Sequence, residues 1–288
     1  IDPDAVGPLR RFIGPPLQDT FAGLGLDAAG VEVAIAAYRA YFGDVGLYAL
    51  EELRWALDAG RAKLAASRPQ ERVAAASSPG GVLDLTVTLS GEGRIGYAVA
   101  RGGKPVIGES QLGFLFADAP QMLRNFALVA QTSRDRDETW EQPWGEWRTV
   151  RDRHRELALT FEEKSKLKRR MTVIFRLFDN GIAFRYEFPR QPNLARASIT
   201  EELTQFRIAE EGEAWWSPAF ESNREEYLFQ QTPIAGITTV QTPVTMRTAN
   251  GTHIAIHEAA LVDYSGMNVR GVENGLLEAV LTYSAAGP

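Results

Sequence analysis

The sequence predicts a mainly β protein, a large antiparallel β-sandwich preceded by a short α-helical segment. Three observations predict this class. Residues 1–76 are rich in Ala, Leu, Arg and Glu, and their apolar residues recur three and four positions apart, which is the spacing of amphipathic helices. Beyond residue 76 apolar and polar residues alternate, which is typical of half-buried strands. Turn residues rather than helices separate these later segments, which favours antiparallel pairing over a parallel sheet.

The helical segment is expected within residues 1–76. Val31, Ile35 and Tyr38 fall on one face of a helix, and Gly and Pro residues separate this run from its neighbours, so several short helices are predicted. The run AAASSPGG at 74–81 consists of small and turn-forming residues. We therefore place a domain boundary between residues 76 and 77.

The strands are predicted where the period is two. Residues 83–89, 173–177 and 182–188 alternate in this way, and Asp179-Asn180-Gly181 lies between the last two. Asn and Gly tolerate positive φ, so this tripeptide predicts a hairpin turn. Asn250-Gly251 predicts a second turn, directly before an alternating strand at 253–257.

Composition and charge exclude several classes of protein. The 288 residues are 44% hydrophobic and 24% charged, which is ordinary for a globular chain. A formal net charge of -6 argues against nucleic acid or an anionic membrane surface as partner. The absence of Cys excludes disulfides, cysteine zinc sites and thiol nucleophiles. No apolar run is long enough to span a bilayer.

Ionisable residues gather in THIAIHEAALVDYSGM at 252–267. Two of the three histidines lie here, and His257 is followed by Glu258, Asp263 and Tyr264. One interpretation is that His257 caps a strand end and Glu258 bonds the following loop, because buried polar groups are normally satisfied within the fold. The other is that both face a substrate or another domain. Asp263 is most simply a turn residue.

Several longer motifs lie in the second part of the chain: GKPVIGESQLGF (103–114), FRLFDNGIAFRYEFP (175–189), AWWSPAF (214–220), EEYLF (225–229), QTPVTMRT (241–248) and IHEAALVDYSGM (256–267). Together they make residues 77–285 resemble the N-terminal domain of glycoside hydrolase family 97, α-glucosidases and α-galactosidases that act on neutral sugars. The resemblance implies a β-supersandwich of the galactose-mutarotase-like type, with a catalytic (β/α)8 barrel following where this chain stops.

This resemblance also implies a division of labour. Glycoside hydrolysis needs two carboxyl groups that flank the scissile bond, and in the family both lie on the barrel. We therefore expect that this chain alone does not hydrolyse glycosides. The N-terminal domain of the family lends one glutamate to a calcium ion, and Glu226, directly before Tyr227, matches that position, with Glu225 as the neighbouring alternative. Because calcium takes about six to eight oxygen ligands, binding by this chain alone is expected to be weak or absent.

Two further features keep alternative interpretations open. Trp215 and Trp216 are adjacent in a predicted strand, so at most one can enter the core. Trp140, Trp144 and Trp147 invite sugar stacking, but packing in a core or an interface is favoured for most of these tryptophans, because an indole buries a large area. The basic run 164–170 stands beside two glutamates and predicts a solvated loop or hairpin rather than a nucleic-acid site.

Residues 8–71 resemble a different family, the cap of haloacid dehalogenase-like phosphatases of the phosphoglycolate phosphatase kind. The paired aspartates that supply the nucleophile in that family are absent from this segment, so no phosphatase activity is expected.

The leading hypothesis is therefore a non-catalytic N-terminal domain of a calcium-dependent family 97 glycoside hydrolase. It would complete an active site on a barrel and contact neutral α-glycosides or oligosaccharides, with His257 and Glu258 as substrate-binding candidates. The alternatives are a stand-alone carbohydrate-binding module and an inactive phosphoglycolate phosphatase-like remnant. Neither nucleic acid nor a membrane is expected as a partner. The glycosidase resemblance implies a periplasmic or secreted location, and the phosphatase resemblance implies a cytoplasmic one as the alternative.

Overall fold

The computed structural model describes residues 70–221 and 227–282, together with Ala29. The chain divides into two compact units, Ile1–Pro69 and Gln70–Pro288. Except for Ala29, which is helical, the helices expected within 1–76 lie outside the described residues, and so does the segment that resembles a phosphatase cap. The first described strand, β1 (Glu71–Ser77), begins before the boundary expected at 76 and belongs to the second unit.

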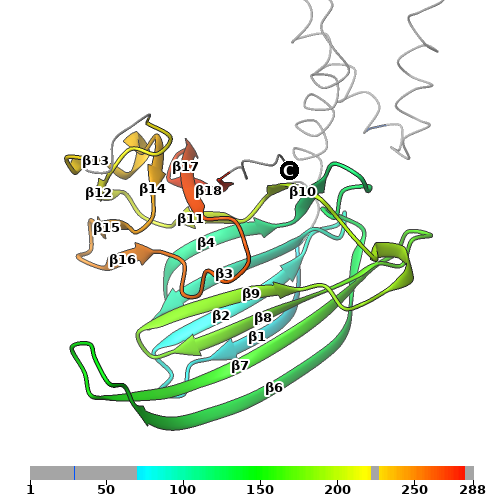
Figure 1. Ribbon diagram of the computed structural model, residues 1–288, viewed down its shortest axis with the longest axis horizontal. Coiled ribbons are helices and arrows are strands. Elements are labelled where there is room, and N and C mark those ends of the chain that lie inside the picture. Colours follow the sequence, from blue (N-terminus) through cyan, green and yellow to red (C-terminus); the bar gives the residue numbers. More distant parts are fainter. Residues whose placement is uncertain (1–28, 30–69, 222–226, 283–288) are drawn as a thin grey trace, which may run out of the picture. The chain divides into compact units, whose positions relative to one another are not determined.

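The second unit is built around one eight-stranded antiparallel sheet (Figure 1). Its order is β1-β2-β3-β4-β11-β18-β17-β14. Besides β1, the strands are β2 (Leu83–Leu89), β3 (Ile95–Arg101), β4 (Lys104–Leu112), β11 (Gln205–Ile208), β14 (Thr239–Gln241), β17 (Met267–Glu273) and β18 (Leu276–Leu281).

Two four-stranded antiparallel sheets and one short ladder complete the described fold. One sheet has the order β6-β7-β8-β9, with bounds Phe126–Glu141, Thr149–Glu163, Arg170–Phe178 and Gly181–Glu187. The other has the order β13-β12-β15-β16, with bounds Gln230–Pro233, Gly212–Trp216, Val244–Thr248 and His253–Ile256. The ladder pairs β5 (Phe114–Phe116) with β10 (Ile199–Glu202), and two 3-10 turns, η2 and η3, span Pro192–Leu194 and Ile234–Gly236.

Two hydrophobic cores explain why this is a double sandwich. In the first, side chains of β1–β4 pack against those of β6–β8; in the second, β11, β14, β17 and β18 pack against β12, β15 and β16. Ile107 on β4 touches both cores. These cores form because the predicted alternation puts apolar side chains on the inward faces of the sheets. Examples are Leu85 and Val87 on β2, and Val173 and Phe175 on β8. The prediction of a mainly β, antiparallel sandwich is confirmed.

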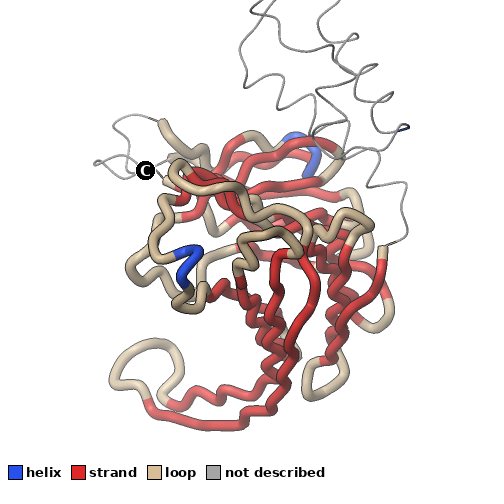
Figure 2. The backbone as a smooth tube through the Cα atoms, turned by 90° about the vertical axis from the view of Figure 1, so that its right-hand side faces the viewer, coloured by secondary structure: helices blue, strands red, loops and turns tan. Residues whose placement is uncertain are grey.

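Local turn chemistry is also confirmed. The pairing of Phe178 with Gly181 closes the β8–β9 hairpin over Asp179 and Asn180. The Asn250-Gly251 turn joins β15 to β16, and Gly251 has the positive φ, 86°, that the turn requires. The longest hairpin, β6–β7, pairs without interruption from Arg134 to Glu141, and its far end curves away from the sandwich (Figure 2).

The basic run 164–170 is the loop of the β7–β8 hairpin, but it is not fully solvated as predicted. Arg169 is buried, and its guanidinium forms a bidentate pair with Glu163 at 2.7 and 2.8 Å. It also donates to the carbonyls of Pro120 and Gln121, at 2.6 and 3.0 Å. This buried arginine thus ties the loop before β6 to the β7–β8 hairpin. Among the described residues no helix is both long and apolar enough to cross a membrane.

Candidate functional site

The sequence-predicted polar cluster forms the loop 257–266, which connects β16 to β17. Strand β16 alternates as expected, with Ile256 buried and His253 and Ala255 exposed. The strand ends there, so His257 opens the loop with an exposed side chain, and Glu258 after it is half-buried. Asp263 adopts φ of 50°, in the left-handed region, which agrees with its predicted role as a turn residue.

This loop is held by a buried carboxylate that sequence reasoning missed. Glu202, the last residue of β10, is 9% exposed, and the hydroxyl of Tyr264 donates to its Oε2 at 2.8 Å. Thr204 donates to the other oxygen, Oε1, at 2.6 Å. The single hydroxyl hydrogen of Thr204 is donated to Glu202, so in the hydrogen bond between Tyr186 and Thr204 the Tyr186 hydroxyl is the donor. A chain of hydroxyls therefore links β9, the segment after β10, and the candidate loop.

The electrostatics of Glu202 follow from its burial. Burial raises the pKa of its carboxyl, the hydrogen bonds from Thr204 and Tyr264 act against that rise, and the nearby charge of Glu258 adds to it. Burial and the Glu202 carboxylate likewise raise the pKa of Tyr264. Glu258, one of the predicted substrate-binding residues, thus lies close enough to Glu202 to influence its titration. The substrate-binding roles of Glu258 and His257 stay predictions.

The raised pKa has a testable consequence for stability. The folded protein holds the Glu202 proton more tightly than the unfolded chain does, so this proton adds to the free energy of unfolding. Its contribution is fully present below the ordinary pKa of 4.5 and is lost as the pH rises through the raised pKa of the folded state. We expect the free energy of unfolding to fall less steeply above pH 4.5 in Glu202→Gln than in the wild type. Urea unfolding across a pH series measures this. The adjacent exposed residue provides the control, Glu201→Gln, which should keep the wild-type slope; equal slopes in all three proteins would contradict the assignment.

The predicted metal ligand Glu226 lies outside the described residues, as does Glu225. What the structure describes is the two ends of their loop, which joins β12 to β13. Phe220 on one side has φ of 59°, an uncommon conformation for a bulky residue, and the Tyr227 hydroxyl on the other side donates to the carbonyl of Glu221 at 2.8 Å. Across the described ranges there is no group of three or more His, Asp or Glu arranged to hold a metal ion.

The tryptophans divide as strand geometry requires. Trp216 is buried and donates from Nε1 to Thr232 at 3.0 Å, whereas Trp215 faces the other way, beneath the guanidinium of Arg247. Around the β6–β7 turn, Trp140, Trp144 and Trp147 are exposed, so none of the three packs in a core of this unit. Packing of these tryptophans in an interface stays a prediction.

A hollow of about 300 Å³ lies elsewhere, between β1 and the β6–β7 hairpin. It is lined by Ala75, Ala76, Gln131, Ser133, Arg134, Asp135, Arg155 and Leu157, none of which is a predicted site residue. Its wall includes the bidentate pair of Arg155 with Asp135, at 2.7 and 3.0 Å. We therefore place the candidate site on the loops 217–229 and 257–266 and not in this hollow.

Comparison with known proteins shows where the fold has been seen before. Residues 76–285 match the sequence profile of the family described as Glycosyl-hydrolase 97 N-terminal. A glycoside hydrolase family 97 enzyme from Pseudoalteromonas sp. strain K8, solved in complex with acarbose, is 36% identical, with a TM-score of 0.71. A variant of that enzyme in complex with panose gives the same values.

The matches cover 74% of this chain but only 32% of those two structures, so the chain spans about a third of their length. The crystal structure of a β-arabinopyranosidase is 23% identical with a TM-score of 0.66, over 74% of this chain and 36% of that one, and this likeness concerns the fold alone. The match begins at residue 76 and gives no support to the phosphatase resemblance of residues 8–71.

Proposed function

The chain belongs to glycosyl-hydrolase family 97, since residues 76–285 are the N-terminal domain of that family, and from this premise we propose that it completes the active site of a longer, calcium-dependent enzyme. In this proposal the enzyme is an α-glucosidase or α-galactosidase, and the catalytic acid and base lie on a barrel domain outside this chain. The partners are that barrel and a neutral oligosaccharide, and the location is periplasmic or secreted. The ligands of the similar Pseudoalteromonas enzyme, acarbose and panose, support the sugar class.

The observation that carries the proposal is the exposure of large apolar side chains on the two candidate loops. Leu228 and Phe229, which follow Glu226 closely, are 91% and 71% exposed. Leu261 and Val262, in the loop that begins with His257 and Glu258, are also exposed. Grouped apolar residues on loops mark surfaces that a partner covers. The same loops that carry the candidate site residues therefore have the character of a docking rim.

Within the described unit the buried carboxyl group of Glu202 suits positioning rather than acid–base chemistry. A glycosidase needs one carboxyl that can reach the leaving oxygen and a second across the bond. Glu202 has a raised pKa but is buried and engaged by the hydroxyls of Thr204 and Tyr264. We assign it to holding the loop 257–266 in place, so that Glu258 and His257 can face a substrate.

Calcium would bind between domains in this scheme. Glu226 would supply one carboxylate oxygen, and the remaining ligands would come from the rest of the enzyme and from water, since calcium prefers six to eight oxygens. A bound calcium ion would supply positive charge beside the reacting sugar. This chain's contribution would be to place Glu226 between the apolar residues Phe220 and Leu228, whose exposed side chains flank the loop.

Two assays test the proposal. The chain alone, with calcium and a nitrophenyl α-glucoside or α-galactoside, is expected to release no nitrophenol. Exchanging the N-terminal domain of the Pseudoalteromonas enzyme for residues 70–288 should preserve calcium-dependent hydrolysis, and Glu226→Gln in that exchanged protein should lower activity at least about tenfold. Glu221→Gln, on the same loop, is the matched control and should retain activity. Turnover by the chain alone that Glu226→Gln abolishes would contradict the proposal.

A further inference from the structure

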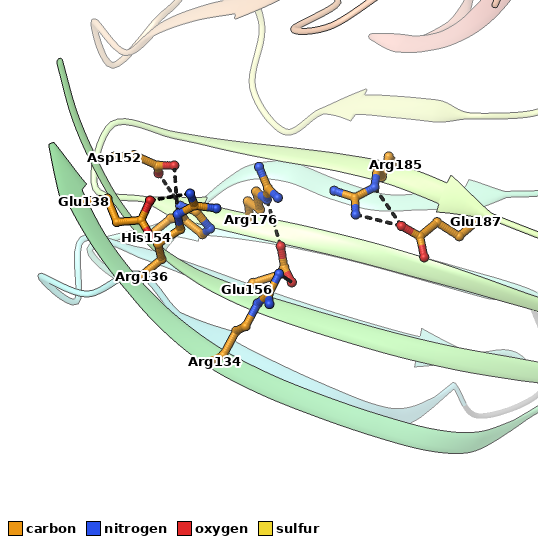
Figure 3. A network of polar contacts seen from close by, with 9 residues as sticks. All are labelled: Arg134, Arg136, Glu138, Asp152, His154, Glu156, Arg176, Arg185 and Glu187. Carbon is orange, nitrogen blue, oxygen red and sulfur yellow. Dashed lines mark hydrogen bonds and ion pairs between the residues drawn. The ribbon is translucent and has the colours of Figure 1, made fainter. Parts of the chain in front are cut away.

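The outward face of the sheet β6–β9 carries an ordered array of charged side chains that neither core uses. Alternation places one set of residues of each strand in the first core and the other set on this face. The outward set is paired across strands: Arg136 with His154 and Glu138 with Asp152 between β6 and β7, and Glu156 with Arg176 between β7 and β8. Figure 3 shows these side chains on one side of the ribbon.

The array is held in place by its own contacts. Glu156 accepts from Arg134 at 2.7 Å and from Arg176 at 2.9 Å, which joins three strands through one carboxylate. Burial raises the pKa of Glu156, but the two arginines outweigh that effect and hold it below its ordinary value, so the group is ionised. Asp152 contacts the Nδ1 of His154, whose ring packs on Phe178 with centroids 5.0 Å apart.

The remaining pairs repeat this pattern at the two ends of the face. Arg136 contacts Glu138, and Arg185 on β9 pairs with Glu187 at 2.7 Å. The Glu156 carboxylate and the His154 ring lie buried within this network, with side chains 8% and 1% exposed. The exposed members are Arg134, Arg136, Glu138, Arg185 and Glu187. Their guanidinium and carboxylate groups are fixed by these pairs and have little freedom left to lose on binding.

The charges of the array cancel. Leaving His154 aside, four arginines stand against four carboxylates: Arg134, Arg136, Arg176 and Arg185 against Glu138, Asp152, Glu156 and Glu187. Such a face offers no net attraction to a phosphate, a nucleic acid or an anionic lipid surface. A dense set of charged groups is also unlike the centre of a stable protein interface, where charged residues are depleted. The ligand that remains compatible is neutral and rich in hydroxyl groups.

An exposed indole stands at the end of the array. Trp140 follows Glu138 by two positions on β6 and pairs with Val150, so it lies on the same outward face. It is 47% exposed. An indole combines a large apolar plane with a polar edge, which suits the apolar face of a sugar ring. From Arg134 to Trp140 the face extends about 20 Å along the strand, a length that suits a short oligosaccharide.

We propose that the outward face of β6–β9, from Trp140 to the Arg134–Glu156–Arg176 bridge, is a carbohydrate-binding surface for a neutral oligosaccharide. It is separate from the loops 217–229 and 257–266 and does not rest on the function proposed for them. The sugar ring stacks on Trp140, and its hydroxyl groups exchange hydrogen bonds with the exposed side chains of Glu138, Arg136 and Arg134.

Titration calorimetry of the full chain with panose and with maltotriose tests the proposal. We expect saturable binding in the millimolar range, weakened at least about tenfold in Trp140→Ala and largely kept in Trp140→Phe. Because Trp140 is half exposed, both variants should retain the wild-type circular dichroism and urea midpoint. Trp144→Ala, at the hairpin turn, is the matched control and should bind within about twofold of the wild type.

Three outcomes would overturn the proposal. One is the absence of saturable binding by the wild type for both sugars. The second is binding that Glu258→Gln abolishes and Trp140→Ala leaves unchanged, since the sugar would then occupy the loop 257–266. The third is equal loss in Trp144→Ala and Trp140→Ala, which would place the sugar at the hairpin turn. None of these bears on the domain-exchange assay, so the two proposals fail independently.

Discussion

Replacing Arg169 by methionine is expected to lower the free energy of unfolding by about 3–5 kcal/mol. The substitution keeps a long side chain but removes both hydrogen bonds to the buried carboxylate of Glu163. It also leaves the carbonyls of Pro120 and Gln121 without their donor. A buried carboxylate without its partner is costly because the interior cannot solvate it.

The neighbouring residue supplies the control for this experiment. Arg170 also pairs with a glutamate, Glu162, at 2.7 Å, but its side chain is 56% exposed. Arg170→Met should therefore cost less than about 1 kcal/mol, as solvent-exposed ion pairs usually do. Urea unfolding followed by circular dichroism measures both variants. Similar losses in the two would show that Arg169 is not the buried anchor of the hairpin.

The double variant separates the pair from its surroundings. If Glu163 is costly only because it is unpaired, Glu163→Leu combined with Arg169→Met should recover a large part of the loss, since apolar replacements of buried pairs are often tolerated. The recovery should be incomplete, because the carbonyls of Pro120 and Gln121 still lack a donor. A double variant as unstable as the sum of the two single ones would mean that the two residues are not coupled.

This anchor shows what could not be predicted from sequence. The run 164–170 has the composition of a solvated loop, and most of it is one. Whether an arginine in such a run is buried depends on carbonyls about fifty residues away, and a local pattern holds no information about them. The link between Glu202 and Tyr264, 62 positions apart, was missed for the same reason.

The features that were predicted depend on neighbouring residues alone. The alternation in β2, β8 and β9 and the Asn-Gly turns are set by side-chain period and by φ. The polar cluster at 257–264 could be predicted for the same reason, and the charge of its Glu258 contributes to the raised pKa of the buried Glu202 carboxyl. Local patterns could not show that β11, β14, β17 and β18 extend the sheet of β1–β4, because that depends on pairing between distant segments.

Phenylalanine truncation should distinguish the interior of this unit from its docking rim. Phe175 on β8 is fully buried, with its ring centroid 5.6 Å from that of Phe184 and 6.1 Å from that of Tyr97 on the opposing sheet. Phe175→Ala is expected to lower the free energy of unfolding by about 3–5 kcal/mol, the range for a phenylalanine removed from a packed core. The matched variant Phe229→Ala removes the same atoms from a residue that is 71% exposed, and should cost less than about 0.5 kcal/mol.

Measuring activity as well as stability separates the roles of Phe175 and Phe229. In the domain-exchanged enzyme, Phe229→Ala should lower hydrolysis or domain affinity while leaving the stability of this unit unchanged, because the proposed partner and not this unit covers the ring. If Phe229→Ala instead destabilises the isolated chain by as much as Phe175→Ala, the ring is packed within the chain. The exposed apolar residues of the two candidate loops would then no longer support a partner domain.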